Sequence, residues 1–279
     1  MTGVPMIKLN DGRSIPQLGL GVWQVDPGIT ARVVRDAIEE GFHSIDTAEG
    51  YNNEEGVGEA IKSAGIPRDQ LFITSKLRNG GHARDQALKS FDDTMKALQL
   101  DWLDMFLIHW PVPGQDKYVE AWKTLIELRQ QGRIKSIGVS NFNQNHLERI
   151  IGETGVTPVV NQIELHPYFT QDDKRGYLKT KNIHIESYSP LGSGAVLKDE
   201  TIKSIGQAHG KSVAQVIVRW HIQQGNIVIP KTTHKDRMKE NFDVFDFELS
   251  DDEMKTIAGL DKGEEGRTGS NPATNNDTF

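Results

Sequence analysis

Four strand-like segments in the first half of the chain each end on a polar residue, and these residues recur at a nearly constant interval. They are Asp46, Lys76, His109 and Ser140, and the intervals between them are 30, 33 and 31 residues. Each interval has room for one strand, one helix and two loops, and apolar residues inside it repeat at helical spacing. The chain is therefore expected to form a parallel sheet covered by helices.

Eight strand candidates alternate with helical segments along the 279 residues. They span residues 18–22, 44–48, 71–77, 103–110, 134–141, 159–166, 184–190 and 226–232. An extra helix, 199–209, lengthens the seventh connection. Eight repeats favour a closed (β/α)8 TIM barrel over a doubly wound sheet. No linker interrupts them, so residues 1–279 are expected to form a single domain.

The two ends of the chain carry signals of their own. Asn10-Asp11-Gly12 lies between two short apolar stretches and predicts an N-terminal β-hairpin. Ser250 begins a capping-box pattern and starts a last helix. The segment 263–279 is rich in Gly, Asn and charge. It is either a disordered tail or a C-terminal loop that folds back over the barrel mouth.

Composition excludes several classes of protein. The chain has no cysteine, which rules out disulfides, thiolate metal sites and cysteine nucleophiles. Its net charge of −7, with no block of like charge, argues against a nucleic-acid partner. No segment reaches the roughly 20 apolar residues of a membrane span, and residues 1–12 lack the apolar core of a signal peptide. We therefore expect a cytoplasmic protein without a membrane partner.

Three of the polar strand ends, together with Tyr51 in the loop after Asp46, suggest a catalytic site. In such a barrel Asp46, Lys76 and His109 lie at the carboxyl ends of strands, where active sites are built. Asp46 and Lys76 alone could be a structural ion pair. A Lys76 ammonium beside Tyr51 would instead lower the phenol pKa from about 10 and favour acid-base catalysis. A neutral His109 could orient a substrate oxygen, and we interpret the four residues as one site.

Motifs along essentially the whole chain connect this site to a known family. They are residues 41–48 with Tyr51, then 73–77, 107–111, 137–142, 160–167 and 229–232. Together they resemble the aldo-keto reductase superfamily, and residues 53–58 and 243–247 resemble its microbial 2,5-diketo-D-gluconate reductase-like branch. The resemblance implies NADPH-dependent reduction of aldehydes or ketones, such as keto acids, diketones or keto sugars, to alcohols. Tyr51 would donate the proton, Lys76 and Asp46 would tune it, and His109 would guide the carbonyl.

The resemblance also implies where the cofactor binds. Ser140, Asn141 and Gln162 match the partners of the nicotinamide carboxamide, and Tyr188 matches the aromatic residue that stacks on the ring. The remaining implied positions are Ser189, Leu191, Gly192 and Ser193 around the pyrophosphate, Lys231, Thr232 and Arg237 around the adenosine 2′-phosphate, and Glu240 and Asn241 near the adenine. Two cations and a hydroxyl suit a phosphate dianion, which favours NADPH over NADH.

The substrate pocket is expected to include Trp23 and Trp110 beside His109. Many relatives have Trp where this chain has Arg78. Arg78 would either open the pocket and attract anionic or polyhydroxylated substrates, or point into solvent. Glu164 and His166 have no third ligand at metal spacing, so no metal site is predicted.

Other functions remain open from the residues alone. A barrel aldolase would use Lys76 as a Schiff-base nucleophile, and a glycosidase would need Asp46 and Glu164 as its carboxylate pair. A non-catalytic NADPH-binding protein could share the fold. The chain lacks the Gly-x-Gly-x-x-Gly of a Rossmann site, and we interpret the Tyr-x-x-x-Lys spacing of Tyr177 and Lys181 as coincidence. The partner is expected to be a small-molecule carbonyl, and the resemblance implies a monomer.

Overall fold

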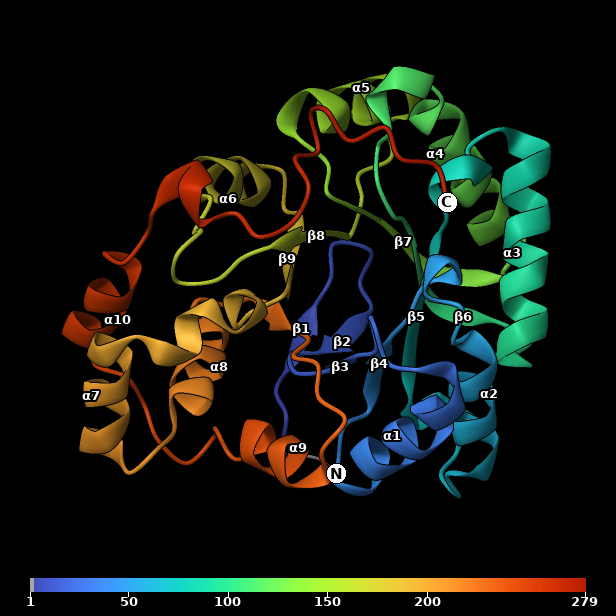
Figure 1. Cartoon of the computed structure of the whole chain (residues 1–279). Coiled ribbons are helices and arrows are strands. Elements are labelled where there is room, and N and C mark those ends of the chain that lie inside the picture. Colours follow the sequence, from blue (N-terminus) through green and yellow to red (C-terminus); the bar gives the residue numbers. More distant parts are fainter. Residues whose placement is uncertain (1–2) are drawn as a thin grey trace.

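The structure is a computed structural model that describes residues 3–279, in which strands and helices alternate along the chain (Figure 1). Within those residues the main sheet has eight strands, each parallel to its neighbour and arranged in chain order. The strands are β3 (Leu20–Gly21), β4 (Ser44–Asp46), β5 (Phe72–Leu77), β6 (Leu103–Ile108), β7 (Ile134–Ser140), β8 (Val160–Glu164), β9 (His184–Tyr188) and β10 (Ile227–Val228). Each lies inside one of the eight predicted segments, so the predicted alternation is confirmed.

The first and last strands of the sheet meet, which closes the barrel. Leu18 forms a parallel bridge with Val228, and the Gly19 amide donates a hydrogen bond of 3.0 Å to the Val228 carbonyl. Gly21 follows at the same seam, where a Cβ atom would lie 3.0 Å from the carbonyl oxygen of Ile229. Glycine therefore allows the two strands to approach, and the fold is the expected (β/α)8 barrel.

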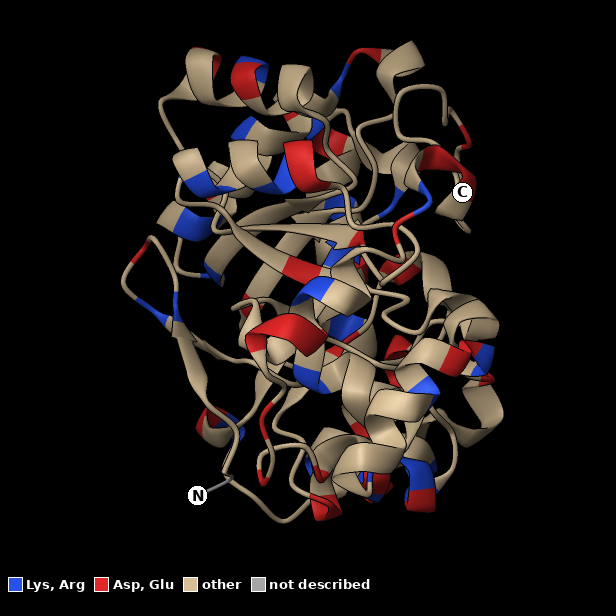
Figure 2. Cartoon of the chain, turned by 90° about the vertical axis from the view of Figure 1, so that its left-hand side faces the viewer, with Lys and Arg blue, Asp and Glu red and all other residues tan. Residues whose placement is uncertain are grey.

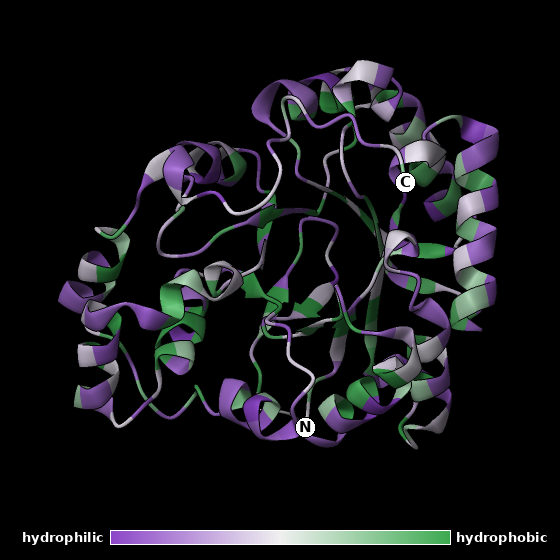
Figure 3. Cartoon of the chain, viewed as in Figure 1, coloured by the Kyte–Doolittle hydropathy of each residue, from purple (hydrophilic) through white to green (hydrophobic). Residues whose placement is uncertain are grey.

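Helices surround the sheet on its outer side (Figure 1). They are α1 (Pro27–Glu39), α2 (Glu54–Ser63), α3 (Arg84–Leu98), α4 (Tyr118–Gln130), α5 (Gln144–Thr154), α6 (Asp172–Thr180), α7 (Glu200–His209), α8 (Val213–Gln223), α9 (Lys235–Phe242) and α10 (Asp251–Ala258). Helix α7 is the predicted extra helix in the seventh connection. Figure 3 shows apolar residues on the strands and on the helix faces that turn toward them. Apolar helix faces thus cover the outer side of the strands and remove both from water, as this fold requires.

The N-terminal hairpin is confirmed and packs against the interior of the barrel. Strands β1 (Met6–Lys8) and β2 (Ser14–Pro16) are antiparallel, and Gly12 in the turn has a φ of 86°. Leu9 and Ile15 belong to a buried cluster with strand residues that include Leu107. The hairpin therefore fills one end of the barrel and leaves the other end for a site.

Several strands end earlier than predicted, and the residues beyond them line the barrel mouth. β10 stops at Val228, although the predicted segment runs to residue 232. Pro230 has no amide hydrogen to continue the ladder, so Lys231 and Thr232 leave the sheet. His109 likewise follows the end of β6. Because these residues follow the carboxyl ends of their strands, their side chains lie at the barrel mouth, where active sites are built.

The C-terminal segment folds back across the barrel, which decides between the two alternatives for residues 263–279. Helix α10 begins with the predicted capping box at Ser250. The chain then crosses the mouth toward α3 and α4, where it ends (Figure 1). Asn79 Nδ2 donates a 2.8 Å hydrogen bond to the Asp277 carbonyl, and the Gly114 amide donates one of 2.6 Å to Asn276 Oδ1.

The outer surface is mixed in charge. Figure 2 shows Lys and Arg interspersed with Asp and Glu over the helices and loops. Within residues 3–279, none of the helices combines the length and apolar character needed to cross a membrane.

Candidate active site

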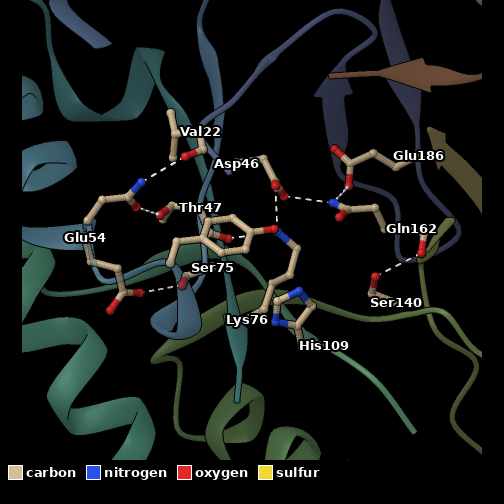
Figure 4. A network of polar contacts seen from close by, with 12 residues as sticks. Val22, Asp46, Thr47, Glu54, Ser75, Lys76, His109, Ser140, Gln162 and Glu186 are labelled. Atoms are coloured by element: carbon tan, nitrogen blue, oxygen red, sulfur yellow. Dashed lines mark hydrogen bonds and ion pairs between the residues drawn. The ribbon is translucent and has the colours of Figure 1, made fainter. Parts of the chain in front are cut away.

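Lys76 lies at the centre of the predicted catalytic cluster (Figure 4). Its Nζ donates hydrogen bonds to Asp46 Oδ1 at 2.5 Å, to the Thr47 carbonyl at 2.9 Å and to Tyr51 Oη at 3.2 Å. An ammonium group has three protons, so its donors are fully used. The structure thus brings Asp46, Tyr51 and Lys76 together as predicted.

The local sequence explains why these three side chains meet. Asp46 ends β4, and Lys76 lies near the end of the neighbouring parallel strand β5. Tyr51 follows on the short 3₁₀ helix η1 (Glu49–Tyr51). The Glu49 carboxylate accepts hydrogen bonds from Ser90 Oγ in α3 and from the Arg78 amide. Glu49, to which the sequence assigns no role, therefore ties the loop that carries Tyr51 to the barrel wall.

The protonation states suit a proton donor. Burial alone would lower the pKa of Lys76, but Asp46 and Tyr51 raise it above its usual value, so Lys76 stays charged. Burial raises the pKa of Tyr51, and Lys76 opposes that rise without cancelling it. The net pKa of Tyr51 is therefore raised, and the expected lowering is wrong. The contribution of Lys76 alone does lower this pKa, as expected. The cause of the net rise is desolvation, which disfavours the phenolate.

His109 lies beside Tyr51 and is neutral. The two rings make an edge contact with a centroid distance of 5.6 Å. Burial, and then the charge of Lys76, lower the pKa of His109 well below its usual value. A neutral imidazole can donate one hydrogen bond to a substrate oxygen without adding a charge.

These residues open into one large cavity of about 1390 Å³ at the barrel mouth. Of the predicted site residues, the cavity is lined by Trp23, Asp46, Tyr51, His109, Trp110, Ser140, Asn141, Gln162, Tyr188, Ser189, Leu191, Ser193, Lys231, Thr232, Arg237, Glu240 and Asn241. Lys76 lies behind Asp46 and Tyr51 and is fully buried. Gly192 is also buried and does not line the cavity, although its neighbours Leu191 and Ser193 do.

Arg78 is the predicted substrate residue that the structure does not bring into this cavity. Its side chain is 50% exposed, and its Nε lies 3.5 Å from Glu49 Oε1. Of the two alternatives for Arg78, its position favours the solvent-facing one. An exposed pair of this kind makes a small contribution to binding or stability.

The three predicted carboxamide partners form a connected polar group on neighbouring strands. Ser140 Oγ donates to the Gln162 carbonyl at 2.9 Å. Asn141 Nδ2 donates to the His109 carbonyl at 3.1 Å, and Tyr188 Oη donates to Asn141 Oδ1 at 2.8 Å. These contacts fix polar side chains along one wall of the cavity, where an amide could both donate and accept.

The segment after β10 contributes two cations to the cavity, and Glu240 on α9 lines it as well. Lys231 and Arg237 line it together with the hydroxyl-bearing Thr232. Lys235, in the same segment, is paired with Glu39 and does not line the cavity. Two cations and a hydroxyl around an open cavity fit a phosphate monoester, and the cavity is large enough for a dinucleotide.

The C-terminal segment supplies cavity residues that the sequence did not reveal. Thr268, Gly269, Ser270 and Phe279 line the cavity. The Phe279 ring makes an edge contact with His109 at 5.8 Å and fills the space that a side chain at Gly50 would occupy. The segment has no periodic pattern, so no sequence signal could have placed it.

Glu164 fastens this segment to the barrel. Its carboxylate accepts hydrogen bonds from the Thr268 amide at 2.6 Å, the Thr268 hydroxyl at 2.7 Å and the Gly269 amide at 2.9 Å. It also lies 2.9 Å from His166 Nε2. Burial would raise the pKa of Glu164, but these hydrogen bonds hold it at about 2. With both oxygens engaged, Glu164 is not available as a glycosidase carboxylate beside Asp46.

Glu164→Ala is expected to release the C-terminal segment. Removing the carboxylate deletes the hydrogen bonds that tie Thr268 and Gly269 to the barrel, and a hydrogen bond to a charged group contributes about 1.5–3 kcal/mol. Thermal unfolding should shift to lower temperature, and limited proteolysis should cut within residues 263–279. The exposed Glu265→Ala in the same segment is the control and should behave as wild type. Equal behaviour of the two variants would contradict the fastening role of Glu164.

Comparisons with known proteins agree with this geometry. A model described as "Aldo/keto reductase family" matches residues 17–262. The chain belongs to the aldo/keto reductase family. It is therefore an oxidoreductase of a family that uses NADP(H).

Individual relatives are similar over almost their whole length. An aldo-keto reductase from Mycolicibacterium smegmatis is 50% identical over 98% of this chain and 99% of the relative. A methylglyoxal reductase DkgA from Escherichia coli is 49% identical over 98% of both chains. A mutant of Gox0644 solved in complex with NADPH is 47% identical with a TM-score of 0.94, over 98% of this chain and 99% of that one.

Proposed function

We propose that this aldo/keto reductase reduces small aldehydes and ketones, including α-dicarbonyls, keto acids and keto sugars, with NADPH as its cofactor. The observation that carries the proposal is the Lys76 Nζ contact with both Asp46 and Tyr51, two residues that line the same cavity as Lys231 and Arg237. The NADPH in a structure 47% identical to this chain supports the cofactor, and the methylglyoxal reductase relatives support the dicarbonyl substrates.

Each catalytic residue would have one task. When bound, NADPH supplies the hydride to the carbonyl carbon. Tyr51 Oη donates its proton to the carbonyl oxygen, and His109 donates a hydrogen bond that holds that oxygen in place. Lys76, kept charged by Asp46, stabilises the phenolate that Tyr51 becomes. The aromatic rings of Trp23 and Trp110 bound the space for the substrate.

The family resemblance assigns the cofactor residues to successive groups of NADPH. Ser140, Asn141 and Gln162 would bind the carboxamide, with Tyr188 stacking on the nicotinamide ring. The remaining positions would be Ser189, Leu191, Gly192 and Ser193 at the pyrophosphate, Lys231, Thr232 and Arg237 at the 2′-phosphate, and Glu240 and Asn241 at the adenine. All of these except Gly192 line the same cavity, which supports the assignment.

The proposal is tested by following NADPH consumption with a panel of carbonyl compounds. Methylglyoxal, simple aldehydes, α-keto acids, diketones and keto sugars are offered separately to the wild-type chain. Turnover of at least one class with NADPH supports the function. No turnover of any class, with cofactor binding intact, would favour a non-catalytic NADPH-binding protein.

A Schiff-base aldolase is the second candidate from the sequence, and the geometry disfavours it. A nucleophilic lysine needs a free, neutral amine. The Lys76 Nζ makes three hydrogen bonds, and its neighbours raise its pKa. Borohydride treatment with a carbonyl substrate is therefore expected to leave Lys76 unmodified.

Arg237→Ala is expected to weaken NADPH selectively. Loss of a charge-assisted hydrogen bond to a phosphate lowers affinity by roughly 10- to 100-fold. The affinity for NADH should not change in this way, because NADH has no 2′-phosphate for Arg237 to contact. Dissociation constants for both cofactors, measured by fluorescence, check this expectation. Lys239→Ala on the same helix is the control, because Lys239 does not line the cavity. A similar loss for both cofactors would contradict a 2′-phosphate contact.

We propose that residues 1–279 form a single domain, which the family match over 17–262 supports. A monomer is proposed from the family resemblance, and the cytoplasmic location expected from the sequence remains a proposal.

A further inference from the structure

Glu186 is a buried carboxyl group beside the proposed active site. It has no role in the proposed mechanism. It lies on β9, is fully buried and does not line the cavity. Its Oε2 accepts a hydrogen bond of 2.9 Å from Gln162 Nε2. Within residues 3–279, its other oxygen has no hydrogen-bond partner.

The strand register explains this contact. Ser140 pairs with Gln162 between β7 and β8, and Gln162 pairs with Glu186 between β8 and β9. Paired residues on neighbouring strands place their side chains on the same side of a sheet. Glu186 therefore faces the barrel interior at the level of two proposed cofactor residues.

Gln162 is held by two carboxyl groups at once. Its Nε2 also donates a hydrogen bond of 2.8 Å to Asp46 Oδ2, so one amide nitrogen connects Asp46 and Glu186 (Figure 4). Both amide protons are then used. The amide oxygen is the polar atom left to meet a ligand, and Gln162 lines the cavity.

We propose that Glu186 is a positioning residue that fixes the Gln162 amide so that its oxygen is presented to the nicotinamide carboxamide. The inference rests on the proposed function, because it assumes that Gln162 binds the cofactor. Asp46 alone does not define the amide plane, since the side chain can still rotate about a single hydrogen bond. The second contact, to Glu186, removes that freedom.

Protonation of Glu186 is compatible with this role. Burial, and then the charge of Asp46, raise the pKa of Glu186 to about 8, so the group is mostly neutral at pH 7. A neutral carboxyl keeps a carbonyl oxygen that can accept from Gln162, and it adds no second negative charge beside Asp46. A glutamine at this position would keep the same acceptor.

The test compares two ligands that differ only in the nicotinamide: NADP⁺ and 2′-phospho-ADP-ribose. Dissociation constants are measured for wild type, Glu186→Leu and Glu186→Gln. In Glu186→Leu, the constant for NADP⁺ should rise about tenfold, the order expected for one lost hydrogen bond, while that for the fragment changes less than about twofold. Glu186→Gln should restore NADP⁺ affinity to within about threefold of wild type.

Two further variants separate positioning from a general structural effect. In a Gln162→Ala background, Glu186→Leu should have no additional effect on NADP⁺ affinity. Glu54→Leu is the control, because it removes another buried carboxyl group that does not line the cavity and accepts hydrogen bonds from Ser75 and Thr94. It should leave the ratio of the two ligand affinities unchanged. Glu186→Ala replaces the leucine variant if the latter does not fold.

The inference is overturned if Glu186→Leu weakens both ligands equally, because that pattern marks a structural role alone. Unchanged NADP⁺ affinity in Glu186→Leu would overturn it as well. A wild-type chain that does not bind NADP⁺ would overturn both the inference and the proposed function. The outcomes are therefore distinguishable.

Discussion

Tyr51→Phe is expected to reduce kcat for carbonyl reduction by roughly 10²- to 10⁴-fold, the range for loss of a general acid. The substitution removes Oη, the group 3.2 Å from Lys76 Nζ, and keeps the ring that contacts His109. NADPH affinity should stay within about threefold of wild type, because none of the proposed cofactor contacts is lost. Steady-state kinetics and a cofactor titration measure the two quantities separately.

The matched control is Tyr177→Phe on α6. Tyr177 is the tyrosine of the Tyr-x-x-x-Lys spacing and does not line the cavity. Its loss should leave kcat unchanged. Full activity of Tyr51→Phe together with inactivity of Tyr177→Phe would overturn the proposed mechanism. It would instead indicate that the Tyr-x-x-x-Lys pair of Tyr177 and Lys181 is catalytic.

The pH dependence of the reaction tests the pKa of Tyr51 independently. Because burial raises the pKa of this phenol above its usual value of about 10, it remains protonated through the neutral range. Reduction should therefore show no loss attributable to Tyr51 between about pH 6 and 9, and should decline above its pKa. Oxidation of the alcohol needs the phenolate and should instead rise with pH. A fall in the reduction kcat beginning near pH 7, absent in Tyr51→Phe, would contradict a raised pKa.

Lys76→Met is expected to lower both stability and activity. It leaves the buried Asp46 carboxylate without its partner at 2.5 Å, and breaking a buried pair in this way costs about 3–5 kcal/mol. It also removes the charge that stabilises the Tyr51 phenolate, so kcat should fall by about 10³-fold or more. Chemical denaturation gives the free energy of unfolding, and steady-state kinetics give kcat.

Two controls separate these effects. Lys89→Met removes an exposed lysine that pairs with Asp93, and should change the free energy of unfolding by less than about 0.5 kcal/mol. The double variant Lys76→Met with Asp46→Leu should recover much of the lost stability, because no unpaired charge remains, yet stay inactive. Wild-type stability of Lys76→Met would show that the pair is not the buried contact described above.

The barrel could be predicted from the sequence because its repeat is local. Asp46, Lys76 and His109 each end an apolar strand, and the interval between them is set by one strand and one helix. Parallel strands bring their carboxyl ends to one edge, so the spacing alone placed these side chains together. The motifs around Ser140 and Lys231 then carried the family resemblance, and both residues line the cavity.

The sequence could not predict contacts that depend on distant segments. Glu164 contacts Thr268 across 104 positions, and Phe279 reaches His109 through a tail with no periodic pattern. The raised pKa of Tyr51 likewise depends on tertiary structure, since desolvation depends on everything packed around the phenol.

Local sequence therefore determined the order of strands and helices and the residues at the strand ends, because side-chain periodicity and strand spacing are short-range properties. Only the tertiary structure decided that the C-terminal segment closes over the mouth, that Arg78 pairs with Glu49, and that Gln162 connects Asp46 to Glu186. Barrel closure brings together strands β4, β8 and β9 at one level. The burial that follows sets which carboxyl groups are charged and which are neutral.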